Sequence, residues 1–158
     1  MTARPVIIGF DGSPTSQRAV REAAALFAPR RALVAVVWEA GRAFEAATTP
    51  ALEAPPVTLE IPAALAADQD AADAAKRTAQ HGVALAKDLG LEATGLAVAD
   101  HGTVADTLIR LAGKHDAQAI VLGTHGRGGV VKRLLGSTSD EVLRHAACPV
   151  VLVRDDDR

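Results

Sequence analysis

Residues 5–10 of the chain read PVIIGF, and Asp11-Gly12-Ser13-Pro14 follow directly. The first six residues form a continuous apolar run with β-branched side chains, which is typical of a strand buried on both faces of a sheet. Ser13 is a preferred helix N-cap, and Pro14 is preferred at the first helical position. We therefore expect a central strand that passes through a tight turn into a helix.

The same alternation continues along the chain. Each apolar run is short enough for a strand, and most are separated by segments with helical spacing. Alternation of this kind predicts an α/β fold with a parallel sheet and helices on both faces, formed as one domain over residues 1–158. The order of the strands does not follow from the pattern. Further strands are expected at 33–38, 91–98, 119–123 and 150–153, and helices from Ser13 to Pro29, over 71–89, from Thr103 and from Ser137 as N-cap.

One segment, about 41–70, interrupts this rhythm. Four prolines occur in it, at positions 50, 55, 56 and 62, among many alanines and with no stable period. Proline and a lack of periodicity are typical of loops. We expect a long variable loop here, with a short extended piece at 57–61.

A glycine-rich stretch, GTHGRGGVVKRLLGS at 123–137, follows the fourth predicted strand and leads into a helix. Glycines let a backbone approach an anion closely, and a helix N-terminus offers unpaired N–H groups with a positive partial charge. The stretch therefore predicts a phosphate cradle. Its expected parts are Gly123, Gly126 and Gly136, the hydroxyls of Ser137, Thr138 and Ser139, and Arg127 as a cation.

Composition and other motifs narrow the possible functions. The net charge of −2 gives no basic excess for binding nucleic acid. A single cysteine, Cys148, excludes an intramolecular disulfide framework, and the five histidines lack ligand spacing, so no metal site made of protein side chains alone is expected. The first apolar run is too short for a signal peptide or a membrane span, which favours a cytoplasmic protein without membrane contact. The glycine stretch matches neither a Walker A motif nor the dinucleotide fingerprint.

The stretches VIIGFDGSPTSQRAV, LGTHGRGGVVKRLLGS and HAACPVVLVR resemble, in that order, the universal stress protein family. The resemblance covers the whole chain except the 41–70 segment, and its glycine motif is that of the single-domain, ATP-binding members. It implies a doubly wound, Rossmann-like sheet of five strands in the order 3-2-1-4-5. It also implies a divalent ion, magnesium or manganese, beside the phosphates of ATP.

The resemblance further implies which residues contact the nucleotide. Gly123, Gly126 and Gly136 with Ser137 would hold the triphosphate, with Arg127, Gly128, Thr138 and Ser139 as neighbours. The remaining contacts would come from the strands: Asp11 and Gly9 near the ribose and adenine, the Val37 backbone at the adenine edge, and Leu122 lining the cleft. From the residues alone, closing a turn as part of Asp-Gly is the favoured role of Asp11, and the resemblance shifts the preference to ligand contact.

A regulatory ATP-binding protein is the function that the resemblance favours. The predicted cleft shows no tuned acid and base pair and no activated nucleophile, which argues against an enzyme. The alternatives are a slow ATPase or adenylyl-transferring enzyme, which would need Asp11 or His125 to position a water or substrate, a binder of AMP or cyclic AMP, and an interaction module without a ligand. The family also dimerises through its fifth strand. The last strand here, Val150, Val151, Leu152 and Val153, is apolar on both faces, and at a sheet edge it would pair with a copy of itself.

Overall fold

The computed structural model describes residues 3–28, 30–42, 61–100, 102–125 and 135–154, and for Ile61 the backbone only. One sheet of five parallel strands contains β1 (Val6–Gly9), β2 (Arg31–Trp38), β3 (Glu92–Ala99), β4 (Ala119–Gly123) and β5 (Val150–Val153) in the order β3-β2-β1-β4-β5. The order implied by the family resemblance is therefore confirmed.

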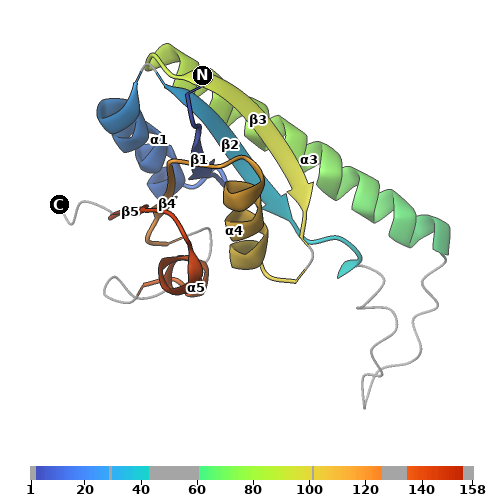
Figure 1. Cartoon of the computed structure of the whole chain (residues 1–158). Helices are drawn as coiled ribbons and strands as arrows, with labels where there is room; N and C mark the ends of the chain where they lie inside the picture. The colour runs from blue at the N-terminus through green and yellow to red at the C-terminus, as the bar shows by residue number, and fades with distance from the viewer. Residues whose placement is uncertain (1–2, 29, 43–60, 101, 126–134, 155–158) are drawn as a thin grey trace.

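The helices cover both faces of this sheet (Figure 1). Helices α1 (Pro14–Phe27) and α3 (Ile61–Asp88) pack on one face, while α4 (Val104–Lys114) and α5 (Ser137–His145) pack on the other. The connections from β1 to β2 and from β2 to β3 thus pass over one face of the sheet. Those from β3 to β4 and from β4 to β5 pass over the opposite face. This is the doubly wound arrangement, and it places a change of winding between β1 and β4.

Local signals start the two helices predicted from Ser13 and Thr103, and a glycine ends α3. Ser13 caps α1, because its side-chain oxygen accepts a hydrogen bond of 3.2 Å from the Ser16 N–H, and Thr103 caps α4 in the same way at 3.0 Å. Gly90 adopts a φ of +90° just after α3, and the Leu91 N–H bonds to the Ala86 carbonyl. A left-handed glycine with this bond is the Schellman end of a helix.

The prediction of a loop over 41–70 is wrong for residues 61–70, which form the first part of α3. The alanines of this stretch favour a helix, and Pro62 lies in its first turn, where proline costs no hydrogen bond. Tertiary contacts also support the helix, because Ala64 is buried and the Asp68 carboxylate accepts the Gly41 N–H at 3.1 Å. The extended piece predicted at 57–61 is wrong for Ile61, which is the first residue of α3. Its other residues belong to 43–60, which lie outside the described residues.

Alanine and valine make up most of the buried apolar side chains among the described residues, so helices and sheet approach closely. Helix α3 touches the sheet at Gly82, where an added Cβ would lie 2.7 Å from Val34 Cγ1 and 2.9 Å from Phe10 Cδ1. Within the described residues, no helix is both long enough and apolar enough to cross a membrane.

This packing predicts opposite effects for two helical glycines. Gly82→Ala should lower the free energy of unfolding by about 1–3 kcal/mol, because the methyl group overpacks the core. Gly113→Ala, in α4 with no atom within 4 Å of the added Cβ, should raise it by up to about 1 kcal/mol through helix propensity. Urea unfolding of both variants measures the difference, and equal effects would contradict the packing at Gly82.

Candidate functional site

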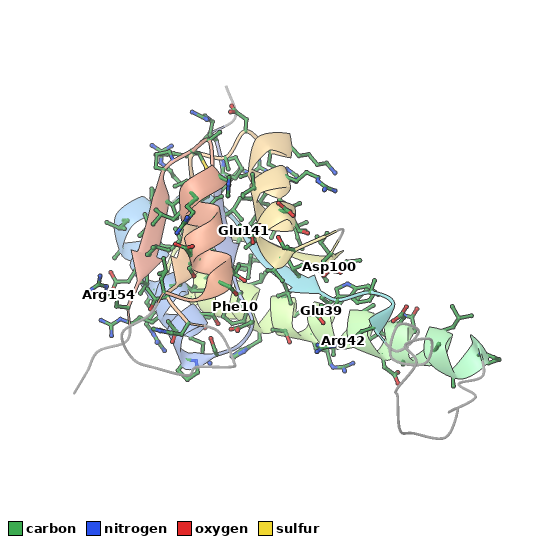
Figure 2. All side chains as sticks on the ribbon, turned by 90° about the horizontal axis from the view of Figure 1, so that it is seen from below. Phe10, Glu39, Arg42, Asp100, Glu141 and Arg154 are labelled. Carbon is green, nitrogen blue, oxygen red and sulfur yellow. The ribbon has the colours of Figure 1, made fainter. Side chains whose placement is uncertain are left out.

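The carboxyl ends of the strands lie on one side of the molecule, which Figure 2 views from below. The residues that follow strands are labelled there: Phe10 after β1, Glu39 after β2, Asp100 after β3 and Arg154 after β5. In a doubly wound sheet, ligands bind beyond these ends, at the place where the winding reverses. That place is the end of β1 beside the end of β4.

The turn after β1 is held by Asp11. Its Oδ1 atom accepts the Ser13 N–H at 2.9 Å, and its own N–H donates to Ser16 Oγ at 3.4 Å. The half-buried Asp11 carboxylate therefore braces the N-terminus of α1. This is the turn-closing role that the Asp-Gly pair suggests.

A backbone hydrogen bond joins the two ends of the glycine-rich stretch after β4. The Gly136 N–H donates to the Thr124 carbonyl at 2.9 Å, and the Thr124 N–H donates to the Val153 carbonyl of β5 at 2.9 Å. A Cβ at Gly136 would lie 3.0 Å from the Thr124 oxygen, so glycine permits this close approach. Thr124, buried and not predicted as a site residue, joins β5 to both ends of the glycine-rich stretch.

The predicted cap of α5 is corrected by the structure. Gly136, not Ser137, is the N-cap, and within the described residues no side-chain cap hydrogen bond is formed there. The Asp140 N–H reaches the Gly136 carbonyl at 2.9 Å, which leaves Ser137, Thr138 and Ser139 with the N–H groups that a helix cannot satisfy internally. A side chain at this cap position would be in tight contact with the Thr124 carbonyl, and glycine avoids that contact.

This uncapped end distinguishes α5 from its neighbours. Of the three helix N-termini whose cap residues are described, α1 and α4 receive a bond from a capping side chain and α5 receives none. Such an end combines free N–H donors with the positive pole of the helix dipole. The arrangement can therefore hold an anion beside the carboxyl end of β4.

Two other predicted site residues bond to each other. The buried Ser139 hydroxyl donates to the Gly123 carbonyl at 2.9 Å and ties α5 to the end of β4. A Cβ at Gly123 would lie 2.5 Å from Thr15 Cγ2, so this glycine lets α1 approach β4. In the described structure both residues thus hold helices against the sheet.

Gly9, Val37 and Leu122 lie on the sheet face that α4 and α5 cover. An added Cβ at Gly9 would collide with Leu122 Cδ2, and Val37 packs against the same core cluster. The structure brings Gly9 and Leu122 together and places Val37 two strands from Leu122 in the sheet. Gly126, Arg127 and Gly128 lie outside the described residues.

His125 is oriented by its neighbour, because its Nδ1 lies 3.0 Å from the Thr124 hydroxyl. Its Nε2 is buried and has no hydrogen-bond partner in the described part of the chain. No three His, Cys, Asp or Glu side chains gather there as a possible metal site, in the segments that the structure describes. The described N–H groups at the start of α5 suit an anionic ligand.

Comparison with known proteins identifies the family. The sequence pattern of the universal stress protein family matches residues 2–154. The chain belongs to this family. It is 44% identical over 43 residues to a universal stress protein of Mycobacterium tuberculosis, covering 27% of this chain and 15% of that protein. It is 40% identical over 53 residues to one of Methanocaldococcus jannaschii, covering 34% of this chain and 31% of that protein.

Solved structures share the fold of the whole chain. The hypothetical protein MJ0577 superposes with a TM-score of 0.78 at 16% identity and full coverage of both chains. A universal stress protein in complex with cAMP gives 0.62 at 24% identity, covering 98% of each chain. The Archaeoglobus fulgidus universal stress protein in complex with dAMP gives 0.61 at 20% identity, covering 98% of this chain and all of that one.

The two serines at the start of α5 should respond differently to substitution. Ser139→Ala removes a buried hydrogen bond and should lower the free energy of unfolding by about 0.5–1.5 kcal/mol. Ser137→Ala removes an exposed hydroxyl that caps nothing and should change it by less than about 0.5 kcal/mol. Urea unfolding checks both, and a larger loss at Ser137 would restore it as the cap.

Proposed function

We propose that this protein binds ATP at the carboxyl ends of β1 and β4, in the cytoplasm, as a nucleotide-dependent regulatory protein of the stress response. The observation that carries the proposal is the uncapped N-terminus of α5, held beside β4 by the bond between Gly136 and Thr124. Its free N–H groups suit phosphate oxygens. Family relatives whose structures contain cAMP or dAMP support an adenine nucleotide as the ligand.

The proposed contacts divide between phosphate and nucleoside. The N–H groups of Ser137, Thr138 and Ser139 would bind the phosphates, because the helix cannot satisfy them internally. The Ser139 hydroxyl would not take part, since it already donates to the Gly123 carbonyl. The stretch with Gly126, Arg127 and Gly128 would complete the cradle beside Gly123 and Gly136. The adenosine would lie toward Gly9, Asp11, Val37 and Leu122.

Magnesium or manganese would accompany the nucleotide as part of its phosphate complex. Bound between phosphate oxygens, the cation would neutralise charge that the described donors, which are neutral N–H groups, do not neutralise. The Asp11 carboxylate, which accepts the Ser13 N–H, would stay the brace of the α1 turn in this complex.

A regulatory role fits the described side chains better than catalysis. Asp11 Oδ1 accepts the Ser13 N–H, and the buried Nε2 of His125 bonds to no described residue that it could activate as a nucleophile. A slow ATPase or adenylyl-transferring enzyme is the alternative function. Turnover above that of an Asp11→Ala, His125→Ala double variant would support it.

The nucleotide preference has a second candidate. The complexes of relatives with cAMP and dAMP favour a monophosphate as the ligand. Competition between ATP, AMP and cyclic AMP in one equilibrium titration decides between the triphosphate and the monophosphates.

Gly126→Val tests the phosphate cradle. A β-branched side chain would occupy the volume expected for a phosphate, so ATP affinity should fall at least about a hundredfold while the fold remains. Isothermal titration with ATP and magnesium measures the affinity, and circular dichroism checks the fold. Gly113→Ala, which adds a side chain in open space on α4, is the matched control and should bind ATP like the original chain. Unchanged affinity in Gly126→Val would remove the cradle from the account.

We also propose a homodimer formed through β5. This strand is at one edge of the sheet, and Val150, Val151 and Leu152 are only half-buried in the single chain. An apolar edge with unpaired backbone groups is prone to pairing with its own copy.

Sedimentation equilibrium tests the dimer. The chain of 16.3 kDa should sediment at twice this mass, and Leu152→Lys, which places a charge on the edge strand, should shift it toward the monomer. Leu143→Lys is the matched control, because Leu143 is 50% exposed on α5 rather than on the strand. A monomer at micromolar concentration would refute the proposal.

A further inference from the structure

The edge of the sheet opposite β5 carries a second open surface. Strand β3 is at this edge, and α3 runs alongside it (Figure 1). An open groove of about 420 Å³ lies between them. Its lining residues are Lys76, Ala79, Gln80, Val83, Ala84 and Lys87 of α3 with Gly95 and Ala97 of β3.

Two residues that line this groove, Gly95 and Ala97, belong to the edge strand β3. The N–H groups of Glu92 and Asp100 bond inward to the carbonyls of Arg30 and Trp38. In a parallel pair, alternate residues bond to the neighbouring strand, so the even-numbered residues of β3 face β2 and the odd-numbered ones face outward. Within the described part of the chain, the N–H and C=O groups of Gly95 and Ala97 therefore have no strand to pair with at this edge.

Helix α3 contributes two rows of side chains next to this edge, one buried and one mostly exposed. Ala75, Ala79, Gly82 and Ala86 are buried against the sheet. Lys76, Gln80, Val83 and Lys87 form the next row on the same helix at spacings of three or four residues, and the first, second and last are exposed. The groove thus has a floor of small apolar groups and a lysine at each end.

We propose that this groove binds an extended acidic segment of a partner protein as a sixth strand beside β3. Strand addition to a sheet edge takes its affinity from backbone hydrogen bonds and its specificity from alternate side chains. The free backbone of Gly95 and Ala97 supplies the bonds, and the lysines select carboxylates. Lys76 already pairs with an exposed Asp73 at 3.2 Å, so an incoming carboxylate would share or replace that partner.

The spacing of the lysines sets the pattern of the segment. Lys76 and Lys87 are eleven residues apart on a helix, which corresponds to about 16 Å along its axis. Residues four apart in a strand face the same side and are separated by about 13 Å, within reach of two flexible lysines. The segment therefore carries Asp or Glu at positions one and five, and a small apolar residue at position three that packs on Val83.

A labelled peptide, acetyl-Thr-Asp-Thr-Val-Thr-Asp-Thr, provides the test with the full chain by fluorescence anisotropy. Binding should be saturable and should weaken with salt. Lys76→Ala and Lys87→Ala should each weaken it by about two- to fivefold. Lys114→Ala, an exposed lysine at the end of α4, is the matched control and should leave it unchanged.

Amide hydrogen exchange adds a signature specific to strand addition. The peptide should slow the exchange of the Gly95 and Ala97 N–H groups and leave those of Leu96 and Val98, which already face β2, unaffected. A peptide N-methylated at the residues that face β3 should lose binding, while one N-methylated at the alternate residues should keep it.

Two results would overturn the proposal. If the peptide does not bind at millimolar concentration, the lysines only oppose aggregation at the sheet edge. If the peptide slows amide exchange outside β3 instead, it binds at another surface. The groove is separate from the proposed ATP site, so Gly126→Val should retain peptide binding. A failure of either proposal is therefore distinguishable from a failure of the other.

Discussion

Strand β1 is enclosed on every side, and the rest of the structure is arranged around it. It pairs with β2 along one edge and with β4 along the other, and Val6, Ile7 and Ile8 have no exposed surface. A strand in this position must be apolar throughout, and helices must cover both of its faces. The winding reverses between β1 and β4, and ligands of doubly wound sheets bind at such a reversal, which is where we propose the nucleotide site.

Close approach is the second constraint, and glycines satisfy it. Gly123 admits Thr15 of α1 beside β4, and Gly136 admits the Thr124 carbonyl at the start of α5. Both glycines belong to the predicted phosphate motif, yet each also has a packing role in the fold without ligand. The same contact that disfavours a side chain at the cap of α5 leaves its N–H groups available. The packing of α1 and α5 on the sheet and the proposed phosphate site thus depend on the same close contacts at Gly123 and Gly136.

Local sequence signals predict the elements of the fold that a single local rule determines. Burial on both faces predicts the strand at 119–123 to the residue. Local signals mispredict the structure where distant contacts decide. The helix at 61–70 is supported by packing and by Asp68, and the N-cap of α5 is Gly136, which bonds to Thr124, rather than Ser137. The roles of Thr124 and of the groove depend on how elements meet in space. The strand order came only from family resemblance, since periodicity does not encode it.

Amide chemical shifts in a titration with ATP and magnesium test the central claim most directly. If the uncapped end of α5 holds the phosphates, the largest changes within the described residues will occur at the N–H groups of Gly136, Ser137, Thr138 and Ser139. Smaller changes will occur at the end of β1. Saturable ATP binding that leaves these four amides unmoved would contradict the account, because the phosphates would then be held elsewhere.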